Sequence, residues 1–449
     1  MFKTLKTAWG VPEIRRKMLF TLFIIVIFRL GSAITVPFLN TATVASWMTE
    51  KASNGNFLEY LNILSGGALA KATMFSLGVT PFINASIIIQ LLTYALPPLE
   101  RLQQEGEDGR KKLNTITSFV ALGLAAFMAV AYYLTLKNMK DSSGASAVKY
   151  TSGGAGIFAM TVIILSFMAG SSLIIWMGNR INEKGIGNGV SMILFAGIVA
   201  RIPEDIGRMI GLIDTKEGAN QNFITIMIYL LIFVVMVVAI VFFNEAERRI
   251  PVQYAKRVVG RKQYGGQSSH IPIKVCMSGV MPIIFAMSFM SLPSMFTIFK
   301  EPVKQITDTT TGGEKFYYYF VNFFSTRSYS YAAIYFVLIL LFNWFYVQIS
   351  YNPVEMANNL RQSNGGIPGI RPGKPTSDYI QRVLSKISLV GAVFLGIVAI
   401  FPIIFVRLTN IDVSTMGGTS ILIVVSVAIE TVRTLESQLM MRHHPGFLR

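Results

Sequence analysis

Side chains that could perform catalysis or bind a metal are few, and their spacing matches no common motif. The three histidines lie in a polar segment and in the C-terminal tail, at His270, His443 and His444. The single cysteine, Cys276, lies in an apolar run, where it is expected to be a small buried hydrophobic residue. Gly373-Lys374 resembles part of a phosphate-binding loop, but Pro368 stands where the first glycine belongs, and both H-E-x-x-H and G-x-S-x-G are absent. The sequence therefore predicts no enzyme, no metal site and no cofactor.

Ionisable residues are also rare within the long apolar segments, and Arg29 and Glu430 are the exceptions that lie away from the ends of their spans. Charged groups inside a membrane usually mark proton relays and ion-coupling sites. Their scarcity argues against an ion-coupled transporter, although sodium can be bound by carbonyl oxygens alone. A secondary transporter of a small solute is the alternative to a channel, and an assembly scaffold without a pore is a further one.

Composition places these residues in a membrane. Apolar residues make up 52% of the 449 residues and charged residues only 14%, whereas soluble domains carry about 25% charged residues. The apolar blocks reach the roughly 20 residues that a helix needs to cross about 30 Å of hydrocarbon. Because lipid offers the backbone no hydrogen-bond partner, such blocks should be helices. The sequence therefore predicts an all-α polytopic membrane protein. Its ten predicted spans are 18–36, 74–95, 114–136, 155–178, 186–200, 222–243, 273–298, 329–350, 387–406 and 417–434.

The orientation of these spans follows from their flanking charges. Segments on the same side as the N-terminus hold roughly twice as many Lys and Arg residues as those on the other side, which is typical of cytoplasmic loops. Both termini are therefore predicted to be cytoplasmic. Ten spans divide into an N-terminal half, 1–220, and a C-terminal half, 221–449. If the halves share a fold, an odd number of spans in each forces them into inverted orientation.

Three connecting segments are too long to be simple turns. Segment 37–73, on the outside, contains an apolar stretch at 57–64 that is too short to span. This stretch either dips back into the protein as a short helix or lies in the outer interface. Segments 244–272 and 351–386, on the inside, are long and basic, and the second is rich in Pro and Gly, which favours shaped docking surfaces over flexible tethers.

Five motifs, spread in order over the chain, resemble those of the SecY family, whose members form the central channel of the Sec protein translocase. The motifs are Pro81-Phe82-Ile83-Asn84-Ala85-Ser86-Ile87-Ile88-Ile89-Gln90-Leu91-Leu92, Gly185-Ile186-Gly187-Asn188-Gly189, Tyr254-Ala255-Lys256-Arg257, Ile367-Pro368-Gly369-Ile370-Arg371-Pro372-Gly373 and Gly417-Gly418-Thr419-Ser420. A single glycine-rich match would carry little weight, but five in register make chance resemblance very improbable.

The resemblance implies a fold and a set of site residues. Two inverted five-helix halves would surround a central pore, with a plug at about 61–73 and an opening towards lipid between the second and seventh helices. The pore ring would comprise Ile83, Ile87, Val190, Leu194, Ile284 and Ile423. The plug would include Asn62, Ile63, Leu64, Ser65, Gly66 and Gly67. Gln90 and Asn188 would belong to the lateral gate. Partner docking would use Arg371, Lys256, Arg257, Arg261 and Lys262.

The resemblance also implies the activity. The chain would be a gated, non-enzymatic channel in the bacterial cytoplasmic membrane that translocates unfolded secretory polypeptides and releases apolar segments into the bilayer. Its partners would be small membrane subunits similar to SecE and SecG, the motor ATPase SecA, and the ribosome with its RNA and proteins.

Overall fold

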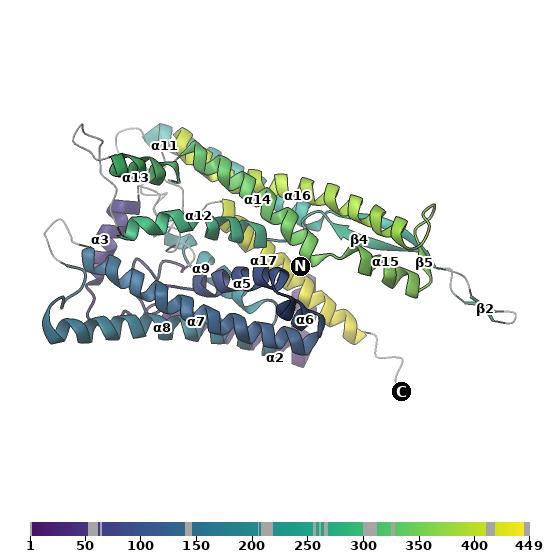
Figure 1. Cartoon of the computed structure of the whole chain (residues 1–449), viewed down its shortest axis with the longest axis horizontal. Helices are drawn as coiled ribbons and strands as arrows, with labels where there is room; N and C mark the ends of the chain where they lie inside the picture. The colour runs from purple at the N-terminus through teal and green to yellow at the C-terminus, as the bar shows by residue number, and fades with distance from the viewer. Residues whose placement is uncertain are drawn as a thin grey trace.

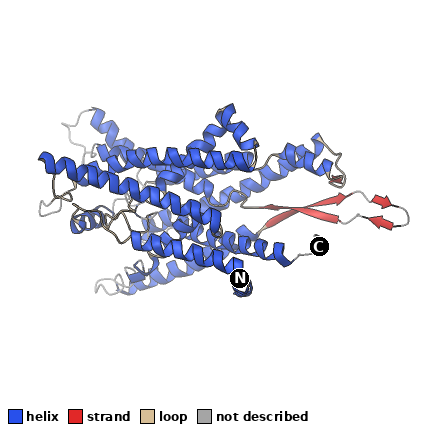
Figure 2. Cartoon of the chain, turned by 90° about the horizontal axis from the view of Figure 1, so that it is seen from below, coloured by secondary structure: helices blue, strands red, loops and turns tan. Residues whose placement is uncertain are grey.

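The computed structural model describes most of the chain and is predominantly helical (Figure 1). The described residues are 2–52, 62, 65–139, 146–204, 206–207, 219–254, 257–259, 262–264, 268–299, 312–324, 328–409 and 418–443. The long helices lie alongside one another, and a pair of strands extends beyond them at one end (Figure 2). The predicted all-α membrane fold is thus confirmed for the body of the molecule, with strands added at one end.

Each predicted span overlaps one helix. The N-terminal five are α2 (Pro12–Gly31), α5 (Thr80–Ala95), α7 (Glu107–Asn138), α8 (Gly153–Lys184) and α9 (Gly189–Val199). The C-terminal five are α11 (Ala219–Glu245), α12 (Met281–Phe299), α14 (Tyr329–Ser350), α16 (Lys374–Thr409) and α17 (Gly418–His443). The short fifth span corresponds to the 11-residue helix α9. The other helices are α1 (Phe2–Gly10), α3 (Thr41–Ala52), α6 (Pro97–Gln104), α13 (Gly312–Phe323) and α15 (Pro353–Gln362).

Length and hydropathy identify this protein as a multi-pass membrane protein. Within the described residues, five helices are long and apolar enough to cross a bilayer, and α5 with α6 forms a sixth candidate that bends by 105°. Large apolar side chains face outwards on these helices, for example Phe119 at 71% and Leu231 at 65% exposure. Contiguous exposed apolar surface of this kind requires a lipid environment or a partner.

Helix packing follows the same pattern in both parts of the chain. In the first part, α5 packs on α7, α7 on α8 and α8 on α9, while α2 contacts both α8 and α9. In the second part, α12 packs on α14, α14 on α16 and α16 on α17, while α11 contacts both α16 and α17. The two sets meet where α9 contacts α17 and where α12 contacts α5 and α7.

The two long basic segments, predicted as separate loops, fold together. Strand β1 (Glu247–Tyr254) pairs antiparallel with β4 (Ser268–Lys274) and also with β5 (Gly365–Gly366) from the second segment. Short strands β2 (Arg257–Val259) and β3 (Lys262–Tyr264) pair beyond them. A small apolar core joins β1, β4, α15 and the first turns of α16, through Ile250, Val252, Ile273, Leu360, Ile367, Ile380 and Leu384. We call this assembly of β1, β4, β5, α15 and the start of α16 the basal unit.

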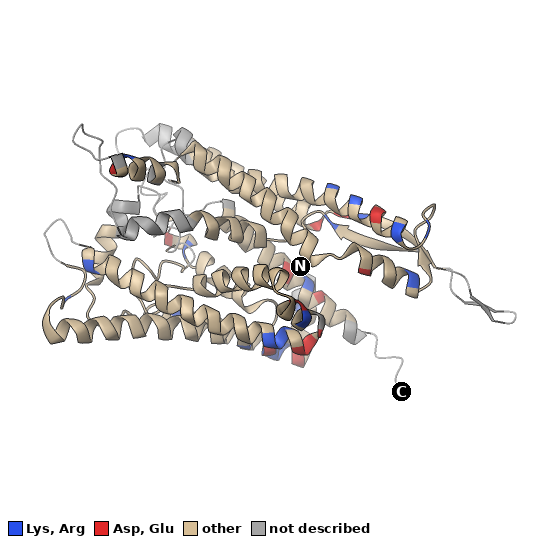
Figure 3. Cartoon of the chain, in the orientation of Figure 1, with Lys and Arg blue, Asp and Glu red and all other residues tan. Residues whose placement is uncertain are grey.

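Charged side chains gather at the end of the molecule that carries the basal unit and α6, whereas the middle of the helical body is almost free of them (Figure 3). Several helices continue into this charged end beyond the predicted spans: α7 begins at Glu107, α8 ends at Lys184 and α16 begins at Lys374. Hydropathy marks only the apolar part of a helix, whereas the backbone hydrogen bonds continue into its polar turns.

Candidate functional site

Four helices bring the six predicted ring residues into one apolar cluster. Ile83, Leu194, Ile284 and Ile423 are buried members of this cluster, and Ile87 and Val190 are partly buried and pack against it. On α5 and α9 the two residues are four positions apart, so each helix presents both side chains on one face. We call the six residues the apolar ring.

The local sequence explains how α9 reaches this position. The Asn188 side chain caps the helix by accepting hydrogen bonds from the Val190 and Ser191 amides at 3.1 and 3.3 Å. Gly189 lies so close to α8 that an added Cβ would sit 2.0 Å from the carbonyl oxygen of Gly178. Only glycine fits there, and Gly187 before it has a φ of +76°, which favours glycine as well. These glycines therefore let the short helix pack deep against α8.

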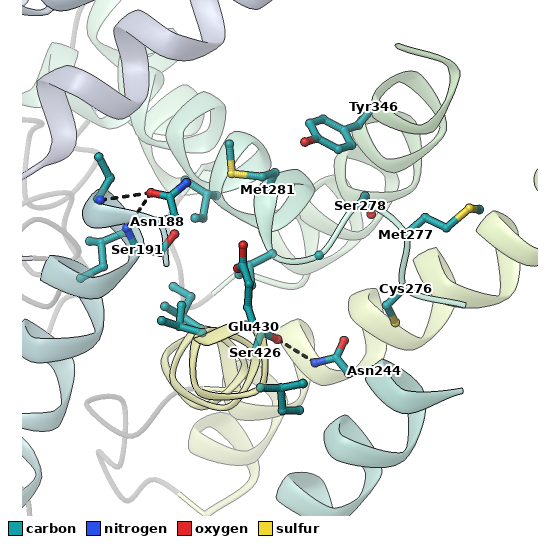
Figure 4. Close-up of a pocket in the computed structure, with 18 of the residues that line it drawn as sticks. Asn188, Ser191, Asn244, Cys276, Met277, Ser278, Met281, Tyr346, Ser426 and Glu430 are labelled. Carbon is teal, nitrogen blue, oxygen red and sulfur yellow. Dashed lines mark hydrogen bonds between the residues drawn. The ribbon is translucent and has the colours of Figure 1, made fainter. Parts of the chain in front are cut away.

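An open cavity of about 840 Å³ adjoins the apolar ring (Figure 4). Five of the six ring residues line it, Ile87 being the exception. The rest of the wall includes polar side chains from several helices: Ser86, Gln90, Asn114, Asn182, Asn188, Ser191, Asn244, Ser278 and Ser426. Its charged lining residues are Lys274, Glu430 and Arg433, all from the C-terminal part of the chain. The cavity thus combines a polar wall with an apolar constriction.

A set of polar contacts fixes one side of this cavity. Arg433 of α17 lies 2.9 Å from the Glu245 carboxylate and donates to the backbone oxygen of Asn244 at 3.0 Å. The Asn244 amide donates to the Ser426 hydroxyl at 2.9 Å, as Figure 4 shows. Burial and then the nearby Arg433 lower the pKa of Lys274, at the end of β4. These contacts are not apparent from the sequence, in which Glu430 stands out as an acidic residue in an apolar helix.

The predicted plug segment runs through the interior where the structure describes it. Asn62 is helical, and its side chain accepts a hydrogen bond from the Ala70 amide at 3.0 Å, while Ser65 is buried. Residues 65–72 and 74–79 form turns that pack against α7 and α8, so the predicted span 74–95 is helical only from Thr80. Ile63 and Leu64 lie outside the described residues, as does most of the apolar stretch at 57–64.

Two contacts hold these turns in place. Gly66, with a φ of +66°, lies against α9, where an added Cβ would be 2.7 Å from the carbonyl oxygen of Gly197. The buried Tyr132 hydroxyl of α7 donates to the backbone oxygen of Leu69 at 3.0 Å. Gly67 has a φ of +85° but more space, because the nearest atom, on Arg201, is 3.9 Å away. Residues 65–79 are therefore packed against the helical body.

The two residues predicted at the lateral gate occupy different places. Gln90 lies on α5, which contacts α12, and it faces the cavity. Asn188 also lines the cavity, but it caps α9 and does not lie on either helix of the α5–α12 seam.

The predicted docking residues lie in or beside the basal unit. Arg371 is exposed in the turn between β5 and α16, and its backbone oxygen accepts a hydrogen bond from the Thr376 hydroxyl at 2.8 Å. Arg257 and Lys262 lie on β2 and β3. Lys256 and Arg261 lie outside the described residues.

Comparison with known proteins agrees with this architecture. The SecY family profile matches residues 73–432. The chain is 39% identical over 446 residues to the protein translocase subunit SecY of Mycobacterium bovis, with 97% of each chain covered. It is 37% identical over 451 residues to that of Streptomyces coelicolor, with 100% of each covered.

Solved structures share the fold at low sequence identity. One, described as the structure of a protein conducting channel, has a TM-score of 0.63 at 15% identity and covers 99% of both chains. Sec61 in the canine ribosome-channel complex has a TM-score of 0.59 at 13% identity and also covers 99% of both. The predicted resemblance is therefore confirmed: this chain belongs to the SecY family of protein translocase subunits.

Proposed function

We propose that this protein is a gated, non-enzymatic channel that translocates unfolded secretory polypeptides across the membrane and releases apolar segments sideways into the bilayer. The observation that carries the proposal is the meeting of six aliphatic residues from four helices beside an open, polar-walled cavity. Membership of the SecY family supports it. A polypeptide would enter through the cavity and pass through the apolar ring.

An aliphatic constriction suits a channel of this kind. A narrow apolar neck expels water, so ions would have to lose their hydration to pass. The ring side chains offer no hydrogen-bonding group that a particular substrate sequence would have to match. They can part around a moving chain and close behind it, which gives a pore that accepts many sequences and still excludes salt.

The remaining site residues take roles around this ring. Asn62 to Gly67 act as part of the plug, held by the contacts of Gly66 and by the Tyr132–Leu69 hydrogen bond. The lateral gate opens along the seam of α5 and α12, with Gln90 and Asn188 on the cavity side. The light packing between α5 and α12, compared with that of α5 on α7 and of α12 on α14, supports this proposal, because separating them breaks few contacts.

The basal unit is the docking surface for partners that supply energy or substrate. Arg371 would contact an acidic surface of the motor ATPase SecA or a ribosomal RNA phosphate, and Lys256, Arg257, Arg261 and Lys262 would add further positive charge. Such contacts weaken as salt concentration rises. Small membrane subunits similar to SecE and SecG would cover apolar faces of the helical body.

The charge distribution supports a bacterial cytoplasmic membrane location with both termini in the cytoplasm. Charged residues gather at the basal end (Figure 3), which would then be the cytoplasmic end. The repeated packing pattern supports a division into halves 1–220 and 221–449, related by inversion.

Reconstitution tests this proposal. Proteoliposomes that contain the protein, the two small subunits, SecA and ATP should protect an unfolded secretory precursor from added protease. Deletion of residues 61–70 should make the same vesicles leak ions. Uptake of a small solute with no polypeptide transport would favour the transporter alternative, which no observation supports. An absence of any leak after the deletion would favour a scaffold without a pore.

A further inference from the structure

Glu430 is an acidic residue of an apolar helix that the proposed function leaves without a role. It lies seven positions after Ile423 on α17, which places both on the same face about two turns, or about 10 Å, apart. Ser426 and Val427, one turn closer to the ring, also line the cavity. Figure 4 shows the Glu430 side chain projecting from α17 into the cavity. A carboxylate therefore stands two turns from the ring, on the approach to it.

The charged groups near Glu430 differ in whether they are already held by a partner. Arg433 is held by the Glu245 carboxylate at 2.9 Å and by the Asn244 backbone oxygen. Lys274 is partly buried at the end of β4, and the negative charges of Glu430, Glu245 and Glu247 attract its ammonium group. Among the described residues, Glu430 itself forms no ion pair within 4 Å, and it is exposed to the cavity. It is thus the carboxylate of this wall that a cation on a polypeptide could reach.

We propose that Glu430 binds a Lys or Arg side chain that precedes the apolar segment of a translocating polypeptide, and that Lys274 opposes this binding. The inference rests on the proposed function, because it needs a polypeptide in the cavity. With the apolar segment at the ring or in the α5–α12 seam, the residues before it would lie beside α17. A basic flank would be retained there while an acidic flank would be repelled. The pair therefore selects substrates by the charge of this flank.

The proposal predicts that substitutions of Glu430 and of Lys274 change the substrate preference in opposite directions. General structural damage would not produce this pattern. Glu430→Gln removes the attraction, so a precursor with a lysine-rich flank should lose its advantage over one with a glutamine flank. Lys274→Gln removes the opposing charge, so the same advantage should grow. A partly hydrated ion pair contributes up to about 1 kcal/mol, which corresponds to about a twofold to fivefold change in the ratio of the two rates.

The experiment measures translocation of both precursors into proteoliposomes that contain the reconstituted translocase with SecA and ATP. Glu436→Gln is the matched control, because Glu436 lies on α17 but does not line the cavity. Glu430→Asp keeps the carboxylate and should retain the preference, which guards against misfolding of the glutamine variant. The expected result is a reduced ratio in Glu430→Gln, an increased ratio in Lys274→Gln and a wild-type ratio in the control.

Two results would overturn the inference. One is a ratio that stays unchanged in Glu430→Gln while both precursors are translocated. The other is a ratio that falls in Lys274→Gln as it does in Glu430→Gln, since that indicates general damage to the cavity wall. If the wild-type protein translocates neither precursor, the proposed function fails instead, so the two failures are distinguishable.

Discussion

Replacing Gly66 with alanine should unseat the plug, and Gly67→Ala provides a matched control. Both glycines have positive φ, +66° and +85°, so alanine costs about 1–2 kcal/mol at either position from the left-handed backbone alone. Only at Gly66 does the new Cβ meet another backbone, at 2.7 Å from the oxygen and 2.8 Å from the Cα of Gly197. At Gly67 the nearest atom is 3.9 Å away.

The difference between the two variants isolates the contact with α9. A clash against backbone cannot be relieved by rotation of a side chain, and overpacking of this kind costs about 1–3 kcal/mol. That energy would shift the balance between seated and displaced plug by about fivefold to 150-fold more in Gly66→Ala than in Gly67→Ala. Because the plug would seal the resting channel, the ion leak should differ in the same direction.

Ion efflux from proteoliposomes, measured without precursor at equal protein content, provides the assay. Gly66→Ala should leak much faster than Gly67→Ala, which in turn should leak somewhat faster than the wild-type protein. Equal leak from the two variants would refute the reasoning, because it would mean that the close approach to Gly197 does not hold the plug in place.

Three further predictions concern the plug, the docking turn and the basal unit. Tyr132→Phe should raise the resting leak by up to about tenfold, because it removes one of the two hydrogen bonds that the Leu69 oxygen accepts, at a cost of about 0.5–1.5 kcal/mol, whereas Tyr133→Phe should not. Arg371→Glu should block translocation in proteoliposomes while the protein inserts and purifies normally. A similar block in Arg110→Glu, which changes an exposed arginine of α7, would argue against a specific docking turn. Ile250→Ala, at a site that is 2% exposed, should destabilise the basal unit by about 2–5 kcal/mol and expose it to limited proteolysis, unlike Val354→Ala at 58% exposure.

The helices were the most predictable part of the fold. An apolar run such as 222–243 must be helical in lipid, and each predicted span overlaps a helix. The ends were less predictable: α16 begins at Lys374, well before the predicted 387, because polar residues can continue a helix once it leaves the membrane. Helix α9 shows that even a short, glycine-bounded span can be placed when its neighbours constrain it.

The basal unit could not be predicted from local pattern, since its pairing is long-range. Gln253 of β1 pairs with Gly366 of β5, more than a hundred residues later, and neither segment shows a strong strand signal. Interpreting both as basic loops identified their charge but missed their shared core of Ile250, Ile367 and Ile380. Tertiary contacts decided the structure there.

The candidate site also has a part that the sequence predicts and a part that depends on tertiary contacts. The ring residues were carried over by position from the family resemblance, and the structure places all six in one cluster. The plug predicted at about 61–73 is described at Asn62 and from Ser65 onwards, where the chain forms turns because Gly66, Gly67 and Gly78 adopt positive φ and interrupt a regular helix. The contacts among Arg433, Glu245 and Asn244 depend on helix α17 meeting the end of α11, which no local pattern reveals.

Crosslinking of a stalled secretory chain tests the central claim most directly. Cysteines would replace Ile83, Val190 and Ile284 one at a time, in a Cys276→Ala background because Cys276 itself lines the cavity. Leu231→Cys, 65% exposed on the outer face of α11, would serve as the control. Crosslinks at the three ring positions and none at residue 231 are the predicted result. A trapped chain that never reacts at the ring, or that reacts equally at residue 231, would contradict the account.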